Sequence, residues 1–374
     1  MNHRSLANHV GPAVATKPVA LWLLACCAMI FAMVVIGGVT RLTESGLSIT
    51  EWRPVTGALP PLSEAEWQAE FAKYRQTPEY REINAGMTLA EFETIYWWEY
   101  VHRLWGRLIG AAFLLPLLWF IIRGQVRGLL AWRLAGIFVL GGLQGGLGWY
   151  MVQSGLADRI DVSPYRLAAH LGLAVVIYAL TLWTALDLLA ERRGGPVGLA
   201  RLTRAVVALV FLTIVAGAFV AGLDAGMIYN TFPLMDGRLT PAGYGDLDPW
   251  WRNLFENAAA AQFNHRWLGI LTLLVALGVV ASAARADPSR RQRSWFYALG
   301  ALALLQVGLG IATLLLAAPI VLAACHQAGA VALLTAALGA THALRGETAS
   351  DRAKIAVADT TTDGPEGVSK ASEA

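Results

Sequence analysis

The sequence is poor in charged residues, and this shortage excludes most soluble folds. Only 15% of the 374 residues are Asp, Glu, Lys or Arg, whereas 56% are hydrophobic and 37 are glycine. This balance lies well outside that of a soluble domain and indicates a polytopic membrane protein. The formal net charge of +3 is too small to argue for a nucleic-acid partner, and no basic run is interleaved with aromatic residues.

Cysteine is scarce as well. The chain has three, Cys26, Cys27 and Cys325, all in or beside hydrophobic stretches. The long polar connections at 42–94 and 223–257 contain none, which excludes a disulfide within them. No small-residue cleavage site follows the first hydrophobic stretch, so we expect a retained helix there rather than a signal peptide.

Eight hydrophobic stretches are long enough to span a bilayer as helices. They cover residues 19–40, 95–122, 131–152, 165–189, 203–222, 258–284, 294–316 and 320–343. An even number of spans places both termini on one side. Arginines gather in three short connections, as Arg123, Arg127, Arg133, Arg192, Arg193, Arg201, Arg204, Arg285, Arg290, Arg291 and Arg293. The positive-inside rule therefore predicts cytoplasmic termini and outward-facing connections at 42–94 and 223–257.

The two halves of the chain resemble each other. The paired segments are Ile36 to Leu47 with Ala216 to Met227, Tyr100 to Gly106 with Phe263 to Gly269, Gln144 to Gly148 with Gln306 to Gly310, and Ala168 to His170 with Ala324 to His326. Each repeat contains four spans, so both repeats share one orientation. We expect an all-α fold of two tandem four-helix bundles, related by a pseudo-two-fold axis along the membrane normal.

This repeat divides the chain into four regions. We expect a cytoplasmic N-terminal extension over 1–18, an N-terminal bundle over 19–190 and a C-terminal bundle over 203–344. The tail over 346–374 is rich in Thr, Asp, Ser and Gly without apolar periodicity, which predicts a disordered segment.

The connection at 42–94 contains two helix start signals. Ser63 and Thr88 are each followed three residues later by glutamate, the pattern of a capping box. After Ser63, the aromatic residues Trp67, Phe71 and Tyr74 fall on one helical face. We therefore expect a helix in this loop and a second span that begins outside the membrane, an arrangement in which the loop can cover a site between the helices.

Four histidines lie inside alternate hydrophobic stretches: His102, His170, His265 and His326. Their helices start on the predicted outer side, so the rings fall on the order of 10 Å below that interface. A titratable residue at this depth is expensive and tends to face a bundle interior, a cavity or a cofactor. Each bundle contributes one pair, and two facing imidazoles suit a flat metallomacrocycle bound through both axial positions of its iron. The alternatives are structural hydrogen bonds and a zinc site, although tetrahedral zinc normally needs a third or fourth ligand.

Glycines near these histidines have two explanations. They lie in the third and seventh spans, as Gly145, Gly146, Gly148, Gly308 and Gly310. Small residues allow close approach of helices, and they equally make room for a flat ligand inside a bundle.

The repeats differ just before the first histidine of each. Glu99 precedes His102 by three residues, and the matching residue of the second half is Gln262. A carboxylate in an apolar setting can exchange protons, whereas an amide only holds geometry. We therefore predict that the N-terminal half carries out chemistry and the C-terminal half holds a resident cofactor. The alternative is that Glu99 simply pairs with Arg103 or Arg41.

Three arginines lie beside or one turn beyond the histidines: Arg103, Arg107 and Arg266. Their guanidinium groups are suited to clamp the carboxylates of a macrocycle's side chains. The alternative is that they snorkel toward the outer head groups.

Taken together, these motifs resemble the heme A synthase family. The residues that carry the resemblance are Thr40 to Ser48, Glu99 to Arg103 with Gly106 and Arg107, Phe263 to Arg266 with Gly269, the segments at Gln144 and Gln306, and His170 and His326. The match runs from about the first span to the eighth. Some members carry paired cysteines in the outer loops, and because this sequence has none, no role of such a pair transfers to it.

The resemblance implies conversion of heme O to heme A, in which a C8 methyl group is oxidised to a formyl group by successive hydroxylations, for cytochrome oxidase assembly. It implies that His265 and His326 ligate a resident heme b, that His102 and His170 bracket the substrate iron, and that Glu99 is needed for activity. It also implies a bacterial inner membrane with the heme sites toward its outer side. The implied partners are lipid, heme O, an electron acceptor, heme O synthase and cytochrome oxidase assembly factors.

A mechanistic constraint follows from two iron ligands. If His102 and His170 both ligate the substrate iron, no position is left for dioxygen. Attack of water on an activated methyl group, with Glu99 taking protons, then becomes the easier route.

Two other functions compete with this one. A di-heme cytochrome b would transfer electrons without modifying either heme, but it gives no reason for a glutamate at 99 and a glutamine at 262. A proton-coupled transporter could use the histidines as a relay, although a relay should cross the midplane rather than gather at one depth.

Overall fold

The computed structural model describes residues 16–53, 56–157, 160–189 and 194–346. Over these ranges the chain is all helical, with no β-strand. Eight helices are long and apolar enough to cross a membrane. They are α1 (Thr16–Leu42), α4 (Leu89–Ile122), α5 (Gly128–Ala157), α6 (Pro164–Leu189), α7 (Val197–Gly222), α9 (Ala258–Ala284), α10 (Arg290–Leu315) and α11 (Ile320–Ala343). The predicted all-α polytopic membrane fold is confirmed.

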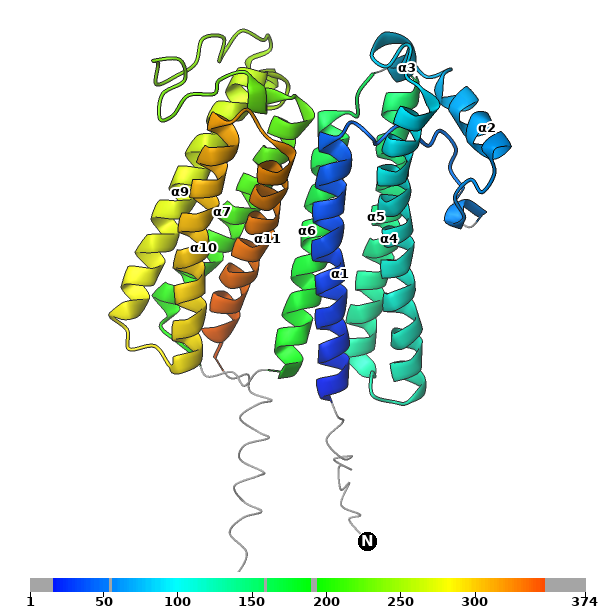
Figure 1. Ribbon diagram of the computed structural model, residues 1–374. Helices are drawn as coiled ribbons and strands as arrows, with labels where there is room; N and C mark the ends of the chain where they lie inside the picture. The colour runs from blue at the N-terminus through cyan, green and yellow to red at the C-terminus, as the bar shows by residue number, and fades with distance from the viewer. Residues whose placement is uncertain (1–15, 54–55, 158–159, 190–193, 347–374) are drawn as a thin grey trace, which may run out of the picture.

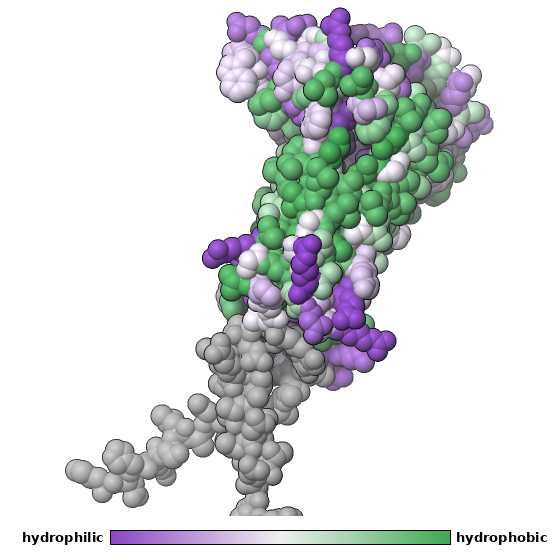
Figure 2. Space-filling model, turned by 90° about the vertical axis from the view of Figure 1, so that its left-hand side faces the viewer, coloured by the Kyte–Doolittle hydropathy of each residue, from purple (hydrophilic) through white to green (hydrophobic). Residues whose placement is uncertain are grey.

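The surface has the polarity expected of a membrane protein. Figure 2 shows a broad hydrophobic band across the middle of the visible face, with polar side chains concentrated above and below it. Many large apolar side chains on the long helices are exposed, such as Leu115, Trp132 and Leu274. In a bilayer these side chains face lipid rather than water.

The eight long helices form two groups of four that lie side by side (Figure 1). The N-terminal half consists of α1, α4, α5 and α6, and the C-terminal half consists of α7, α9, α10 and α11. The two halves meet where α1 packs against α11 and where α6 packs against α7 and α11. Both long connections lie at one end of the helices, here called the long-loop end, and α1 starts and α11 finishes at the other, the tail end.

The predicted spans agree closely with these helices. Those predicted at 258–284 and 320–343 match α9 and α11 at both ends. The helix α4 begins at Leu89, six residues before the predicted span, because the Thr88 capping box starts it outside the apolar stretch. Most of the predicted N-terminal extension and all but the first residue of the predicted tail lie outside the described residues.

The first long connection folds back on α4. It contains η1 (Thr56–Ala58), α2 (Glu64–Tyr74) and α3 (Pro78–Glu82), and the predicted capping box at Ser63 is present. Aromatic side chains from α2 and the early turns of α4 form what is here called the loop cluster: Phe71, Tyr74, Phe92, Tyr96 and Tyr100. The loop helices are thus held by an apolar core of their own, as the aromatic face of α2 predicts.

The second long connection is held by amide side chains. It contains η2 (Ala225–Met227), η3 (Trp250–Arg252) and α8 (Asn253–Glu256). The buried Asn253 side chain accepts a hydrogen bond from the Leu247 amide and donates to the Leu247 and Trp250 carbonyls. Asn257 then caps α9 through the amide of Ala260.

Ion pairs join the two halves at both ends. At the long-loop end, Arg41 donates to both carboxylate oxygens of Asp224 at 3.0 Å. At the tail end, Asp187 of α6 accepts hydrogen bonds from His342 Nε2 at 3.0 Å and from Arg345 at 2.9 Å. The His342 side chain is buried, so this second contact is shielded from solvent.

We expect Phe92→Ala to loosen the first loop without unfolding the membrane helices. The Phe92 side chain is fully buried, and its ring centroid lies 5.0 Å from that of Phe71 and 5.2 Å from that of Tyr74. Truncation of such a ring costs about 3–5 kcal/mol. Limited proteolysis in detergent should cleave 60–88 faster in this variant, whereas Leu59→Ala, at a side chain that is 72% exposed, should not change the rate. Equal cleavage rates in both variants would contradict the loop cluster's role.

Candidate functional site

The four histidines lie on α4, α6, α9 and α11, as the repeat predicts, and all four are half-buried. Each ring lies directly against a glycine of a neighbouring helix. A Cβ atom on Gly37 or Gly217 would stand 3.0 Å from Cε1 of His102 or His265, respectively. In the same way, a Cβ on Gly148 would stand 3.0 Å from Cε1 of His170, and one on Gly310 would stand 2.8 Å from Cε1 of His326.

These contacts explain part of the glycine pattern. Gly148 and Gly310 make room for a histidine ring of their own bundle, at matching places in the two repeats. The other three glycines singled out in the sequence have open space where a side chain would stand: Gly145, Gly146 and Gly308. Helix packing therefore does not account for those three.

The C-terminal pair has the spacing of two axial ligands. The ring centroids of His265 and His326 lie 6.2 Å apart, and the ring planes are nearly perpendicular at 89°. With metal–imidazole bonds of about 2 Å and roughly 1 Å from each ligating nitrogen to its ring centre, a shared metal requires centroids roughly 6 Å apart. His265 Nδ1 lies 3.1 Å from the Thr213 carbonyl oxygen. A hydrogen bond there places the proton on Nδ1 and leaves Nε2 free to ligate.

The second histidine of each half is held by a glutamine. Gln144 Nε2 donates to the His170 carbonyl at 3.0 Å and lies 3.1 Å from its Nδ1. Gln306 Nε2 donates to the His326 carbonyl at 2.9 Å and lies 3.1 Å from its Nδ1. The sequence marks both glutamines as repeat-equivalent, but their contact with the histidines was not predicted.

The N-terminal pair, His102 and His170, lies in the half that contains Glu99 and the first loop. His102 and His170 lie near enough to interact electrostatically. Over the described ranges, no group of three or more His, Cys, Asp or Glu side chains is arranged to hold a metal ion, so the histidines come as pairs.

Glu99 is buried, and hydrogen-bond donors engage both of its oxygens. Oε2 accepts from the Ser48 hydroxyl at 2.7 Å and from the Ile49 amide at 2.8 Å. Oε1 accepts from Arg103 Nη2 at 2.6 Å and Nε at 3.0 Å. The alternative pairing with Arg103 is therefore present, whereas pairing with Arg41 is wrong, because Arg41 pairs with Asp224 in the other half.

The arginines beside the histidines bind loop backbone. Arg103 donates to the carbonyls of Ile49 at 2.8 Å and Glu51 at 3.2 Å. Arg266 donates to the carbonyls of Tyr229 at 2.5 Å and Thr231 at 2.7 Å. The two carbonyls bound by Arg103 and the two bound by Arg266 occupy equivalent positions in the repeat. Both halves therefore hold the loop to the histidine helix by the same arginine contacts, here called the loop clamp. A role in binding macrocycle carboxylates stays a prediction for these arginines.

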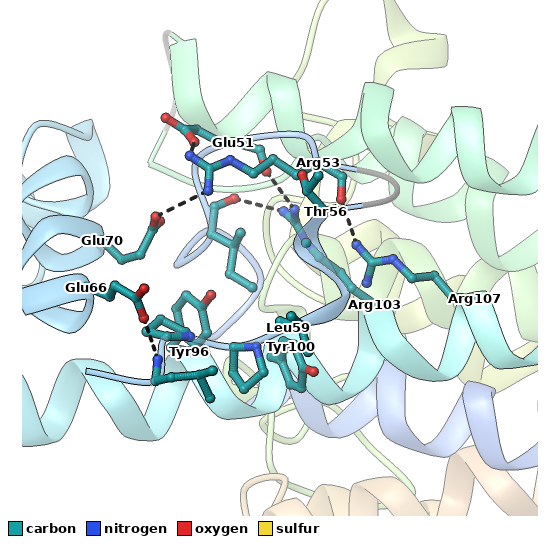
Figure 3. A pocket seen from close by; sticks show the side chains of 15 residues that line it. Glu51, Arg53, Thr56, Leu59, Glu66, Glu70, Tyr96, Tyr100, Arg103 and Arg107 are labelled. Carbon is teal, nitrogen blue, oxygen red and sulfur yellow. Dashed lines mark hydrogen bonds and ion pairs between the residues drawn. The ribbon is translucent and has the colours of Figure 1, made fainter. Parts of the chain in front are cut away.

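Arg107 extends the clamp in the N-terminal half. Its Nη2 donates to the Arg53 carbonyl at 3.0 Å. Figure 3 shows Arg103 and Arg107 reaching from α4 to the loop, where they line a cavity of about 250 Å³ together with Tyr96 and Tyr100. This cavity is polar on the loop side, where Glu51 has its pKa lowered by Lys73 and Arg53 despite an opposing effect of burial.

Comparison with known proteins agrees with these motifs. A chain from Rhodospirillum centenum named heme A synthase is 56% identical over 351 residues, which cover 92% of this chain and 94% of the relative. A second heme A synthase, from Nitrosospira multiformis, is 52% identical over 335 residues, 88% of this chain and 94% of the relative. A third, from Paramagnetospirillum magneticum, is 51% identical over 338 residues, 88% and 94% of the two chains.

A family model gives the same result. The model described as cytochrome oxidase assembly protein matches residues 20–338. This range begins in α1 and ends in α11, so it contains all four histidines, their glycines and both loop clamps. The protein therefore belongs to the COX15-CtaA family of cytochrome oxidase assembly proteins.

Proposed function

We propose that this protein is a heme A synthase, an oxidoreductase that converts heme O to heme A by oxidising the C8 methyl group to a formyl group. Relatives with this name cover most of the chain at about half identity or more. The observation that carries the proposal within this chain is the perpendicular His265–His326 pair at 6.2 Å. The relatives are named as enzymes, which favours this function over a cytochrome that only transfers electrons.

A resident heme b fits the C-terminal half. His265 and His326 would hold its iron, since their spacing suits axial ligation and the Thr213 carbonyl orients His265. When bound, a bis-histidine heme supplies one-electron redox chemistry.

Heme O as substrate fits the N-terminal half. His102 and His170 would bracket its iron, each ring lying against a glycine of a neighbouring helix. If both histidines hold the iron together, water rather than dioxygen would be the source of the formyl oxygen. Oxidation of a methyl group with water releases protons and electrons in equal number, and the electrons pass to an acceptor outside this chain.

Glu99 acts in this scheme mainly through its fixed position. Its contacts with Ser48, Ile49 and Arg103 hold the start of the first loop against α4, one turn from His102. Charge-assisted contacts of this kind are short and strong, so they hold the side chain in place. We therefore expect Glu99 to be required for activity because it positions the loop beside the substrate site.

We infer that the protein lies in the bacterial cytoplasmic membrane with both termini inside. Its relatives are bacterial, and the tail end carries the arginine-rich connections. The long-loop end, with the histidines on its side of the bundle, then faces outward. Heme O synthase and cytochrome oxidase assembly factors are the expected partners for supply of substrate and use of product.

Two histidine variants separate cofactor from substrate. We expect His265→Ala to remove bound heme b, because one axial ligand is lost, and His102→Ala to keep heme b and abolish turnover. A pyridine hemochrome spectrum of the purified proteins and a heme O to heme A assay measure the two effects. Loss of heme b in His102→Ala with retention in His265→Ala would reverse the assignment of the two halves.

The glycine contact gives a second prediction. In Gly217→Ala the new methyl would stand 3.0 Å from His265 Cε1, so the ring must shift. We expect affinity for heme b to fall by about tenfold, in the range for misplaced metal ligands. Gly278→Ala, on the helix that carries His265, is the control, because a Cβ there meets nothing within 4 Å. Equal heme b content in the two variants would show that the contact is unimportant.

Isotope labelling tests the source of oxygen. Turnover in water enriched in heavy oxygen should place the label in the formyl group of heme A, measured by mass spectrometry of the extracted heme. Exchange is controlled by incubating unlabelled heme A with the protein in the same water. Label no higher than in this control, together with label from heavy dioxygen, would reject the water route.

A further inference from the structure

The oxidation proposed above releases protons beside His102 and His170, and Glu99 is poorly suited to take them. Both of its oxygens already accept hydrogen bonds, two of them from the Arg103 guanidinium. Protonation would break this ion pair and leave Arg103 without its carboxylate partner in a buried place. Another group is needed to carry protons from the N-terminal half to solvent.

Glu79 has the properties that Glu99 lacks. It lies on α3, yet its side chain is buried, with only 6% of the residue exposed. Its Oε2 has no partner among the described residues, and the Tyr74 hydroxyl is close enough to act on the pKa of this carboxyl group. Tyr74 is itself fully buried and accepts a hydrogen bond from Asn84 Nδ2 at 2.7 Å. An unpaired buried oxygen is costly unless it carries a proton or contacts water.

The position of Glu79 is at the mouth of the N-terminal half. Its helix α3 packs against α5. Three other carboxylates act on it: Glu44, just after α1; Glu99, on α4; and Asp161, between α5 and α6. These groups come from around the long-loop end of the bundle that carries His102 and His170. Glu79 therefore lies at the long-loop end of the half that carries the proposed substrate site.

Burial and the surrounding charges keep Glu79 protonated at neutral pH. Burial is the largest cause, and the negative charges of Glu99, Glu44 and Asp161 add to it, whereas the Tyr74 hydroxyl acts in the opposite direction. Together they raise its pKa to about 8. A group of this kind gains and loses protons close to physiological pH.

A loop carboxylate of the C-terminal half lies in a different setting. The carboxylate of Glu256, in the second loop, forms an ion pair with Arg252 at 2.6 Å and accepts a hydrogen bond from Tyr165 at 2.9 Å. These contacts lower its pKa. Glu256 thus stays ionised, as expected in the half that holds a resident cofactor.

We propose that Glu79 is the proton-transfer residue of the N-terminal half, which accepts protons released at the His102–His170 site and delivers them to solvent at the long-loop end. The inference rests on the proposed function. In each step the Glu79 carboxylate gains one proton to become a carboxylic acid and then loses it to water, so no electron moves. Glu79 acts at a distance from the reacting atoms and is not assigned contact with heme.

The first test is the pH profile of turnover. Because an acceptor must be ionised, wild-type turnover should rise as pH passes through about 8, where Glu79 loses its proton. In Glu79→Gln this rise should vanish. Turnover at pH 8 should fall at least about tenfold, which is less than the loss expected for a residue that exchanges a proton directly with the reacting group. Glu82→Gln is the matched control, because Glu82 lies on the same helix and is exposed.

The outcomes separate this inference from the proposed function. If the wild-type protein forms no heme A from heme O, the proposed function fails. If it does, and Glu79→Gln keeps the wild-type pH profile and rate, the role of Glu79 is overturned. Unchanged heme b absorption in Glu79→Gln shows that a lost rate is not a lost fold.

An infrared titration tests the same group without turnover. The wild-type protein and Glu82→Gln should show a protonated-carboxyl stretch at pH 7 that disappears by pH 9, and Glu79→Gln should lack it. The same titrating band in Glu79→Gln would overturn the proposal. Should Glu79→Gln fail to fold, the wild-type titration decides, and absence of a carboxyl band that titrates near pH 8 counts against Glu79.

Discussion

Each of the four histidine rings fills the space that a side chain would take on the helix facing it. The glycines at 37, 148, 217 and 310 make this possible, and any larger residue would overpack the contact by about 1–3 kcal/mol. A polar ring inside an apolar bundle is thereby held in one place by backbone rather than by a flexible neighbour. The distance across the His265–His326 pair follows from how closely α7 approaches α9 and how closely α10 approaches α11.

The difference between Glu99 and Gln262 follows from the loops that these residues hold. In the N-terminal half, the Ser48 hydroxyl and the Ile49 amide both point at a carboxylate. The residue in step with Ser48 is Ile228, which has no hydroxyl, and Gln262 instead donates to the Tyr229 carbonyl at 3.3 Å. Each side chain suits the donors or acceptors of its own loop. The two positions therefore have different structural contacts, and the functional difference predicted from Glu99 and Gln262 stays a prediction.

The sequence predicts those parts of the fold that depend on local pattern. Apolar length alone locates the eight spans, and Thr88 with the glutamate at 91 locates the early start of α4. The repeat shows which histidines belong together. In contrast, the partner of Glu99 depends on how the chain after α1 returns to α4, which no local pattern specifies. The choice of Arg103 over Arg41 became clear only in three dimensions.

Burial inside a polar loop is equally hard to predict. In the sequence, Glu79 is surrounded by charged and polar residues, a pattern typical of a helix exposed to solvent. Its burial arises because α3 packs on α5 and because Tyr74 lies in the loop cluster, both long-range contacts. Gln144 and Gln306 illustrate the same limit, since a glutamine within a span is compatible with many partners.

The ion pairs that join the halves bear on how a large flat substrate reaches its place. Arg41 with Asp224 at one end, and Asp187 with His342 and Arg345 at the other, link the two bundles at both ends. Under the proposed function, a porphyrin that reaches the N-terminal half without parting the two bundles would pass α4 or α5, because the contact between the halves is formed mainly by α1, α6, α7 and α11.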